Sequence, residues 1–264
     1  MTTSDPFIAV ENLVVRYGDL TVLDGVSFEV RQGDIFVILG GSGSGKTTLL
    51  RTLVGLKRPA AGRILFQGED FTAMSEGERI EFRKKMGMSF QGSALLKSIS
   101  LADNVALPLR EHTALEESTN DIMTRIKLEL VGLGGFENYL PSELSGGMKK
   151  RAGIARAMAM DPEIIFYDEP SAGLDPIVAA GIDELIRKMQ ETFKLTSVVV
   201  THEMESVKLI ADAVCMLKSG RVVGVGTLDE LEHSDHPYVQ QFFARRPDDE
   251  TEDSSYARAL TGLE

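Results

Sequence analysis

Alternating apolar and polar residues mark the start of the chain as strand-forming. Three stretches, 8–10, 13–15 and 22–30, alternate in this way and are broken by a turn-forming segment at 17–19, which predicts strands of a mainly antiparallel layer. The next stretch, 34–39, is almost wholly apolar and predicts a short buried strand. We therefore expect the first third of the chain to be rich in strands.

The middle of the chain shows helical spacing instead. A charged helix is predicted over 75–85 and a short strand over 86–90. Beyond this strand, helical patterns at 101–107 and 116–131 occur without any strand signal. We interpret this region as a helical subdomain inserted at about residues 92–150.

Strands and helices alternate again in the last part of the chain. The predicted strands cover 164–167, 197–201, 213–217 and 221–225, and the predicted helices cover 147–159, 177–192 and 237–244. Such alternation is typical of a parallel sheet covered by helices, so we assign the chain to the α/β class. Residues 1–244 are expected to form one domain, and the acidic residues 245–264 a tail that is disordered or docked on a partner.

The composition fits a folded protein with a sizeable core, because 43% of the 264 residues are hydrophobic and 26% are charged. A formal net charge of −12 argues against a general nucleic-acid-binding surface, so no nucleic-acid partner is expected. No stretch approaches the roughly 20 apolar residues that cross a bilayer, and the N-terminus lacks a basic start. The chain is therefore expected to be cytoplasmic. Its single cysteine, Cys215, lies in an apolar run and is expected to be a packed thiol.

Residues 40–47 match the full phosphate-binding loop pattern, between an apolar strand and a helical segment. Glycines let successive N–H groups point at phosphate oxygens, and the following helix N-terminus adds its dipole. Lys46 is expected to reach the β- and γ-phosphates, and Thr47 to coordinate Mg²⁺. The residues expected to hold the nucleotide here are Gly40, Gly41, Ser42, Gly43, Ser44, Gly45, Lys46, Thr47 and Thr48. An ordinary glycine-rich loop is the alternative, which the complete match and both flanks argue against.

Two carboxylates, Asp168 and Glu169, directly follow the apolar run 164–167. In nucleotide hydrolysis Asp168 would hold Mg²⁺ through its water shell, and Glu169 would orient and polarise the attacking water. The alternative is a strand that merely turns polar as it leaves the core. That interpretation would be preferred for the pair alone, but not beside a complete phosphate loop, because ligands bind at the carboxyl ends of strands in open α/β sheets.

A third segment provides a second anion site. Ser145 is placed to cap a helix that starts with Gly146 and Gly147, and the exposed N–H groups of such a helix start attract phosphate. The chain thus has two phosphate-type sites but one nucleotide cradle. We expect the second site to close on nucleotide held by another copy of the chain, although a plain glycine-containing helix start is common in isolation.

Together these segments resemble the nucleotide-binding subunit of an ATP-binding-cassette (ABC) transporter, over about residues 7–244. The resemblance implies a P-loop NTPase cassette, in which a RecA-like parallel sheet carries an antiparallel β layer and an inserted helical subdomain. It also implies that ATP and Mg²⁺ bind, that two copies form a homodimer around two nucleotides, and that ATP hydrolysis drives transport.

Further residues take their roles from this resemblance. Tyr17 matches the aromatic residue that stacks on adenine, and Gln91 matches the glutamine that contacts Mg²⁺ and the attacking water. Residues 145–147 match the signature that binds γ-phosphate in trans, and 171–175 match the loop that communicates across the dimer. His202 matches the switch histidine that contacts the γ-phosphate, although a lone histidine after a strand is more often structural.

One position departs from the common pattern. Met148 follows Gly147 where most signatures have glutamine, and methionine cannot supply an amide hydrogen bond. This form of the signature, together with residues 167–176, resembles the ATPase of Mla-type systems, which move phospholipids with MCE-domain proteins. That resemblance implies a separate integral membrane permease, an MCE-domain substrate-binding protein and a small STAS-domain regulator as partners. It also implies a peripheral subunit at the cytoplasmic face of the inner membrane.

Other classes of ATPase fit less well. A DNA-repair or chromosome-structure ATPase would need a long coiled-coil insertion, a translation-associated member of the superfamily would carry two cassettes, and a small GTPase would carry a guanine-reading motif. Within transporters, the runner-up is an importer of another small substrate such as an amino acid. The permease is expected to dock at 95–100, for which a solvent-exposed turn is an equal alternative. A further hypothesis is that 256–263 reaches the neighbouring subunit.

Overall fold

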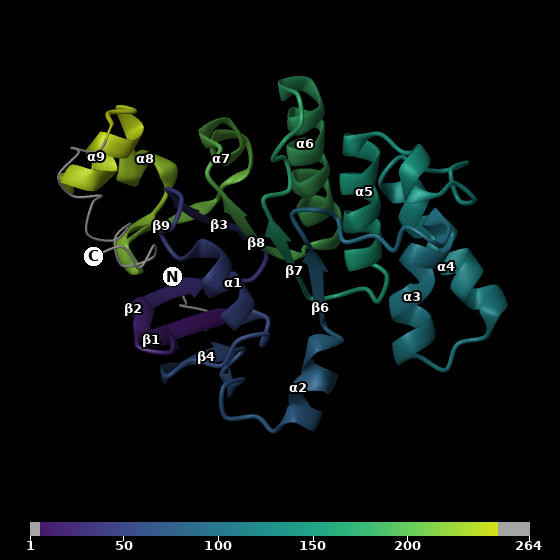
Figure 1. Cartoon of the computed structure of the whole chain (residues 1–264), viewed down its shortest axis with the longest axis horizontal. Helices are drawn as coiled ribbons and strands as arrows, with labels where there is room; N and C mark the ends of the chain where they lie inside the picture. Colours follow the sequence, from purple (N-terminus) through teal and green to yellow (C-terminus); the bar gives the residue numbers. More distant parts are fainter. Residues whose placement is uncertain (1–5, 248–264) are drawn as a thin grey trace.

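Two β-sheets organise the part of the chain that the computed structural model describes, residues 6–247 (Figure 1). The smaller sheet has the strand order β2-β1-β4-β5 and is antiparallel throughout. Its strands are β1 (Ile8–Tyr17), β2 (Leu20–Val30), β4 (Ala61–Phe66) and β5 (Glu69–Asp70). The predicted antiparallel layer is confirmed. The gap in the pattern between 10 and 13 is a register shift inside β1 and not a strand end.

The larger sheet has the strand order β10-β9-β3-β8-β7-β6. Its strands are β3 (Ile35–Gly40), β6 (Met86–Ser89), β7 (Ile164–Asp168), β8 (Thr196–Thr201), β9 (Ala213–Lys218) and β10 (Arg221–Gly226). All neighbouring pairs are parallel except β9 with β10, which forms an antiparallel hairpin at one edge. The predicted α/β class with a parallel sheet is therefore confirmed. The carboxyl ends of β3, β7 and β8 lie side by side, which brings the phosphate loop, Asp168 and the segment after Thr201 to one edge.

The helices pack around the larger sheet and extend to one side of it (Figure 1). They are α1 (Lys46–Leu53), α2 (Glu76–Arg83), α3 (Leu101–His112), α4 (Glu117–Leu130), α5 (Gly146–Ala157), α6 (Pro176–Phe193), α7 (Met204–Ile210), α8 (Leu228–Glu232) and α9 (Pro237–Phe243). A short 3₁₀ turn, Pro141–Glu143, precedes α5. Within the described residues α3, α4 and α5 contact one another, whereas the limits of a helical subdomain at 92–150 stay a prediction.

Two apolar cores lie on the two faces of the larger sheet. Strand β3 is buried along its whole length, and its side chains alternate between them. Val37 packs in the core that contains α5 and α6, whereas Phe36 and Ile38 pack in the core shared with α1 and the smaller sheet. Cys215 lies in this second core, and burial raises the pKa of its thiol to about 12. The predicted packed thiol is confirmed.

No helix within residues 6–247 is both long and apolar enough to cross a membrane. The expected tail begins at Arg245, and its first three residues continue from α9. The predictions for the rest of the tail, including 256–263, lie outside the described residues.

Candidate functional site: a phosphate loop beside a Glu–His pair

The phosphate loop joins the end of β3 to the start of α1 through a backbone that only glycine adopts easily. Gly45, the residue before α1, has a φ of 104°, which is costly for any residue with a Cβ. A Cβ at Gly45 would also lie 2.7 Å from Leu23 Cδ2, and a Cβ at Gly40 would meet the main-chain oxygen of Leu217. The tight turn therefore follows from the glycines, and it presents the N-terminus of α1 to the loop.

Lys46 lies inside this loop. Its side chain is buried, and Nζ donates hydrogen bonds to Gly40 O at 2.7 Å and Gly41 O at 2.9 Å. Burial lowers the pKa of Lys46, while the nearby carboxylates of Glu169 and Asp168 oppose that shift. A buried cation next to a helix N-terminus favours an anion strongly.

Ser44 adds a second feature that fits a phosphate. Its Oγ is buried and has no hydrogen-bond partner among the described residues. A buried hydroxyl of this kind is rare unless a ligand or water satisfies it. Thr47 and Thr48 lie on the first turn of α1, with Thr47 exposed and Thr48 half-buried, while Ser42 and Gly43 are exposed on the loop. The loop as a whole therefore fits the phosphates of a nucleotide.

Asp168 ends β7 next to this loop. Burial raises the pKa of its carboxyl and Glu169 adds to the rise, whereas Arg51, Lys150 and Lys46 oppose it. No cluster of three or more His, Cys, Asp or Glu able to hold a metal occurs in residues 6–247. Mg²⁺ does not require one, since it is commonly bound by one or two carboxylates together with substrate phosphates. Asp168 with the Thr47 hydroxyl fits that donor set.

Glu169 and His202 form the most specific contact of the site. Glu169 Oε1 lies 2.8 Å from His202 Nδ1, whereas Oε2 is buried and has no partner among the described residues. The main chain of Glu169 has a φ of 49°, and its N–H donates to Val200 O at 2.9 Å. A glutamate in this left-handed conformation is strained, and such strain concentrates at functional sites. The contact joins the ends of the adjacent strands β7 and β8.

Lys150 is a member of the site that the sequence analysis missed. Its buried Nζ donates to Gln91 O at 2.6 Å and to Glu169 O at 2.7 Å, so it holds the two segments together through their main chains. Burial lowers its pKa, and Glu169 and Asp168 oppose the shift. Helical spacing could have identified it, because Lys150 lies on the same face of α5 as the buried Gly147 and Ile154. The Gln91 side chain itself is exposed.

The signature segment starts α5 as predicted. Ser145 is the N-cap, and its Oγ accepts a hydrogen bond from Met148 N at 3.2 Å. Gly146 and Ser145 are exposed, whereas Gly147 is buried against α6. Met148 is partly buried and packs against the core, so an apolar contact takes the place of the amide that glutamine has at this position in most signatures. In Figure 1, α5 lies on the far side of β7 and α6 from α1, so the signature and the phosphate loop form two separate places.

The comparison with known families agrees with this geometry. The profile described as ABC transporter matches residues 23–172, which is more than half of the chain. This chain belongs to the ABC transporter family.

Relatives of this ABC chain carry two kinds of name. It is 45% identical to the intermembrane phospholipid transport system ATP-binding protein MlaF of Haemophilus influenzae, with 91% of each chain covered. It is 43% identical to the protein of the same name from Escherichia coli K12, over 85% of this chain and 84% of that one. It is also 41% identical to the probable ribonucleotide transport ATP-binding protein mkl of Mycobacterium tuberculosis H37Rv, over 90% of this chain and 67% of that one.

Solved ABC structures share the fold. A dimeric post-hydrolysis state of the ATP-binding cassette MJ0796, bound to ADP and Pi, superposes with a TM-score of 0.76 at 29% identity and covers 84% of this chain and 98% of that one. The structure of cbiO1 from Clostridium perfringens, part of the transporter complex cbiONQ, gives a TM-score of 0.80 at 28% identity over 98% and 100% of the two chains. The predicted ABC cassette fold is confirmed, and the chain is an ABC ATPase.

Two other segments of the ABC cassette have predicted roles that no contact here tests. Tyr17 is 43% exposed, and Lys57 Nζ lies 4.2 Å from the centre of its ring, so an accessible aromatic face stands beside a cation. In the segment 171–175, Asp175 caps α6 by accepting hydrogen bonds from Ile177 N and Val178 N. Adenine stacking by Tyr17 and communication through 171–175 stay predictions.

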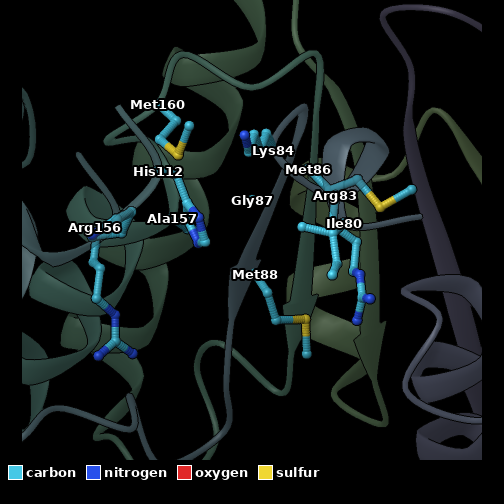
Figure 2. A pocket seen from close by; sticks show the side chains of 11 residues that line it. Ile80, Arg83, Lys84, Met86, Gly87, Met88, His112, Arg156, Ala157 and Met160 are labelled. Atoms are coloured by element: carbon cyan, nitrogen blue, oxygen red, sulfur yellow. The ribbon is translucent and has the colours of Figure 1, made fainter. Parts of the chain in front are cut away.

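The ABC cassette also has a cavity of about 470 Å³ away from the phosphate loop. Figure 2 shows Met160, His112 and Arg156 on one side of it and Ile80 and Met86 on the other. The first three come from or follow α3 and α5, and the other two come from α2 and β6. The cavity therefore lies between α2 and β6 on one side and α3 and the end of α5 on the other.

Proposed function

We propose that this chain is the ATP-hydrolysing subunit of a transporter that moves phospholipid between membranes, through a separate permease and an MCE-domain protein. The observation that carries the substrate class is the 45% identity, over nine-tenths of both chains, to a protein named for intermembrane phospholipid transport. The name of the mkl relative refers to ribonucleotide transport, and no relative named above supports an amino-acid importer.

The phosphate loop and its neighbours are proposed to bind ATP with Mg²⁺. The Lys46 amine would leave its two carbonyl partners for the β- and γ-phosphates, and Ser44 Oγ would gain a partner. Thr47, Gln91 and Asp168 would hold Mg²⁺. When bound, Mg²⁺ would supply positive charge beside the phosphates, where negative charge develops during hydrolysis.

Glu169 is proposed to act on the attacking water. Its free oxygen, Oε2, accepts a hydrogen bond from the water, and Oε1 stays on His202 Nδ1, which fixes the carboxylate. The other nitrogen of His202 is then available to the γ-phosphate. Gln91 is linked to this site because Lys150 Nζ donates hydrogen bonds to the main-chain oxygens of both Gln91 and Glu169.

Two copies are proposed to close head to tail around two nucleotides. The N-cap of α5, with Ser145 and the N–H groups of Gly146 and Gly147, would meet the γ-phosphate held by the other copy. This arrangement makes the closed dimer depend on ATP, because the nucleotide supplies part of the interface. The MJ0796 cassette is dimeric with ADP and Pi bound, which supports dimerisation of this chain.

The permease is proposed to dock between the segment 95–100 and the cavity in Figure 2. Leu96 is half-exposed, and the Asn104 side chain holds its turn by accepting from Leu96 N at 2.7 Å and donating to Ser100 O at 2.9 Å. Arg156 lines the cavity and donates to Ser93 O and Ala94 O, both at 2.7 Å. Arg156 thus joins the wall of the cavity to the two residues directly before this segment. Binding there would keep the chain peripheral, at the cytoplasmic face of the inner membrane, and a STAS-domain regulator is a further proposed partner.

The test measures ATP hydrolysis and phospholipid movement on the chain purified with its native membrane partners. The complex is reconstituted in vesicles of phosphatidylethanolamine and phosphatidylglycerol that carry a fluorescent phospholipid. We expect ATP-dependent movement of the label, and an MCE-domain protein among the co-purified chains by mass spectrometry. If the complex hydrolyses ATP, contains a different soluble receptor and moves no phospholipid, the proposed substrate class is wrong and the ATPase assignment remains.

A single substitution separates the catalytic proposal from the substrate. Glu169→Gln removes the carboxylate and retains the shape of the side chain, so ATP still binds while hydrolysis falls by at least about a hundredfold. A persistent ATP-bound dimer is expected in size-exclusion chromatography. Glu191→Gln changes an exposed acid on α6 and serves as the control. Near-normal hydrolysis by the Glu169→Gln variant would remove Glu169 from its proposed role.

A further inference from the structure

A buried carboxylate lies behind the Glu169–His202 pair. Asp183, on α6, is only 2% exposed, and its Oδ2 accepts a hydrogen bond from Ser206 Oγ at 2.8 Å. The Ser206 hydroxyl also lies 3.2 Å from Ser171 Oγ. All three side chains are buried. A buried aspartate of this kind is unusual, because an ionised carboxylate is costly to bury unless it is well paired.

The hydrogen bonds that connect Ser171, Ser206 and Asp183 have one arrangement when Asp183 is ionised. A carboxylate only accepts, so the single hydroxyl hydrogen of Ser206 points to Asp183. Ser171 must then donate to the oxygen of Ser206. Hydrogen-bond donation therefore runs from Ser171 through Ser206 to Asp183, and this direction depends on the charge of Asp183.

These hydrogen bonds link the same two segments that carry the proposed catalytic pair, Glu169 and His202. Ser171 comes two residues after Glu169, and Ser206 comes four residues after His202. One connection between the segments is thus the 2.8 Å contact of Glu169 with His202, and the second is the 3.2 Å contact of the two serines behind it. Asp183 anchors the second connection to α6, the helix that follows 171–175.

We propose that Asp183 is a positioning residue for ATP hydrolysis, which acts through Ser206 and Ser171 to hold the Glu169 segment and the His202 segment at the correct distance. This inference rests on the proposed roles of Glu169 and His202. An ionised acceptor makes the stronger bond to Ser206. Protonation of Asp183 weakens that bond and allows the direction of hydrogen-bond donation to reverse. The Glu169 and His202 segments are therefore held less rigidly at acidic pH.

The surroundings of Asp183 are consistent with a titration in an accessible pH range. Burial raises the pKa of Asp183 to about 6, with the Ser206 hydrogen bond opposing and the charge of Glu203 adding to the rise. A cavity of about 1200 Å³ borders the residue. The other charged or titratable groups that line this cavity are His202, Glu205, Lys208, Glu232, Arg245 and Arg246.

The test compares the steady-state ATPase activity of wild type and Asp183→Asn between pH 5.5 and 8.5, in the full-length chain with its membrane partners. The amide retains the size and an acceptor oxygen but no charge. At pH 8 we expect kcat to fall about three- to tenfold with KM for ATP within twofold, as expected when one charge-assisted bond weakens. At pH 5.5, below the pKa of about 6, most of the wild-type carboxyl is protonated, so the ratio of the two kcat values moves toward one.

This pH-dependent ratio separates positioning from a plain structural role. Lost packing would lower kcat by the same factor at every pH, whereas loss of the Asp183 charge lowers kcat only where the wild-type carboxyl is ionised. Glu184→Gln, an exposed neighbour on α6, is the matched control and should stay within twofold throughout. A ratio that is constant with pH, or an unchanged kcat at pH 8, would overturn the proposal.

Two more measurements keep the test decisive. Ser206→Ala removes the donor to Asp183 and should reproduce the loss at pH 8, and the double variant Ser206→Ala/Asp183→Asn should lose no more than the larger single effect. Additive losses would mean that the two side chains act separately. If wild type hydrolyses ATP and Glu169→Gln does not, a constant ratio refutes only the role of Asp183; normal hydrolysis by Glu169→Gln refutes the proposed catalytic pair.

Discussion

Asp183 imposes a cost on the folded protein at neutral pH. Its ordinary pKa of 3.8 applies in the unfolded chain, and burial raises the pKa to about 6 in the folded one. The folded state therefore binds a proton more readily than the unfolded state between these two values. The stability that the neutral carboxyl contributes is fully present below about pH 4 and is lost as the pH rises through 6. A residue retained at such a cost is more readily explained by activity than by stability.

We predict that Asp183→Asn is more thermostable than wild type at pH 8. The amide avoids burying a charge, and after allowance for solvent screening the gain is about 1 kcal/mol, or about 2–4 °C in Tm for a chain of this size. At pH 5, where the wild-type carboxyl is mostly protonated, the two proteins should unfold at nearly the same temperature. Circular dichroism melts at both pH values provide the measurement, with Glu184→Gln as the control. A lower Tm for Asp183→Asn at pH 8 would show that the carboxylate stabilises the fold.

At the residue scale, the sequence predicted best where the chemistry is local. The phosphate loop is a run of consecutive residues, so its glycines and Lys46 could be identified from spacing alone. The contact of Glu169 with His202 depends on the pairing of β7 with β8, which places residues 33 apart in the chain next to each other. Lys150 and Asp183 were missed because a charged residue on a helix is usually solvent-exposed, whereas these two are buried.

At the scale of elements, α5 and α6 approach each other closely at Gly147. A Cβ built on this glycine would lie 2.5 Å from Val178 Cγ1, much closer than two carbon atoms can pack. Val178 is β-branched and has little freedom to move away. The glycine of the signature therefore has a packing role as well as its predicted role at the phosphate.

We predict that Gly147→Ala destabilises the protein even though alanine favours helix. The gain in helix propensity is at most about 1 kcal/mol, and overpacking typically costs about 1–3 kcal/mol. Urea unfolding should therefore show a lower midpoint for Gly147→Ala, and Val178→Ala in the same chain should restore part of the loss by making room. Gly77→Ala is the matched control, because a Cβ at this glycine of α2 meets nothing within 4 Å. A midpoint at or above that of wild type would mean that α5 and α6 separate without cost.

Elements were predicted where their own pattern was long enough. Helices α4 and α6 have 14 and 18 residues, and their apolar spacing is clear. Strand β4 contributes only three large apolar residues and pairs with β1, about fifty residues earlier, so its pattern is weak and its pairing is non-local. Helices α7 and α8 have seven and five residues and were not predicted. Helix α9 is as short as α7, but a proline at its first position marks its start.

At the scale of the whole molecule, the fold class followed from alternating strands and helices, whereas the strand order did not. The phosphate loop and the signature lie at the starts of α1 and α5, on opposite sides of β7 in Figure 1. One chain therefore presents two proposed anion sites that its own fold keeps apart. A second copy placed head to tail would bring the signature of each chain to the nucleotide of the other.

This arrangement predicts that a negative charge at the signature prevents dimerisation and leaves nucleotide binding intact. Ser145→Asp is the most informative change, because aspartate caps a helix as well as serine does and so preserves α5. Its carboxylate would face the γ-phosphate held by the partner copy, and two like charges in a closed interface repel strongly. We expect Glu169→Gln with Ser145→Asp to remain monomeric with ATP under conditions where Glu169→Gln alone is a dimer.

Analytical ultracentrifugation with Mg²⁺ and ATP measures the oligomeric state, and titration with a fluorescent ATP analogue measures binding to the monomer. Ser142→Asp is the matched control, since it adds the same charge at an exposed position three residues away, and it should leave the dimer intact. Equal dimerisation by the Ser145→Asp protein would mean that no phosphate lies at the N-terminus of α5 in the closed state. Weakened binding of ATP by the monomer would mean instead that the signature acts on nucleotide in its own chain, which the separation of α1 and α5 argues against.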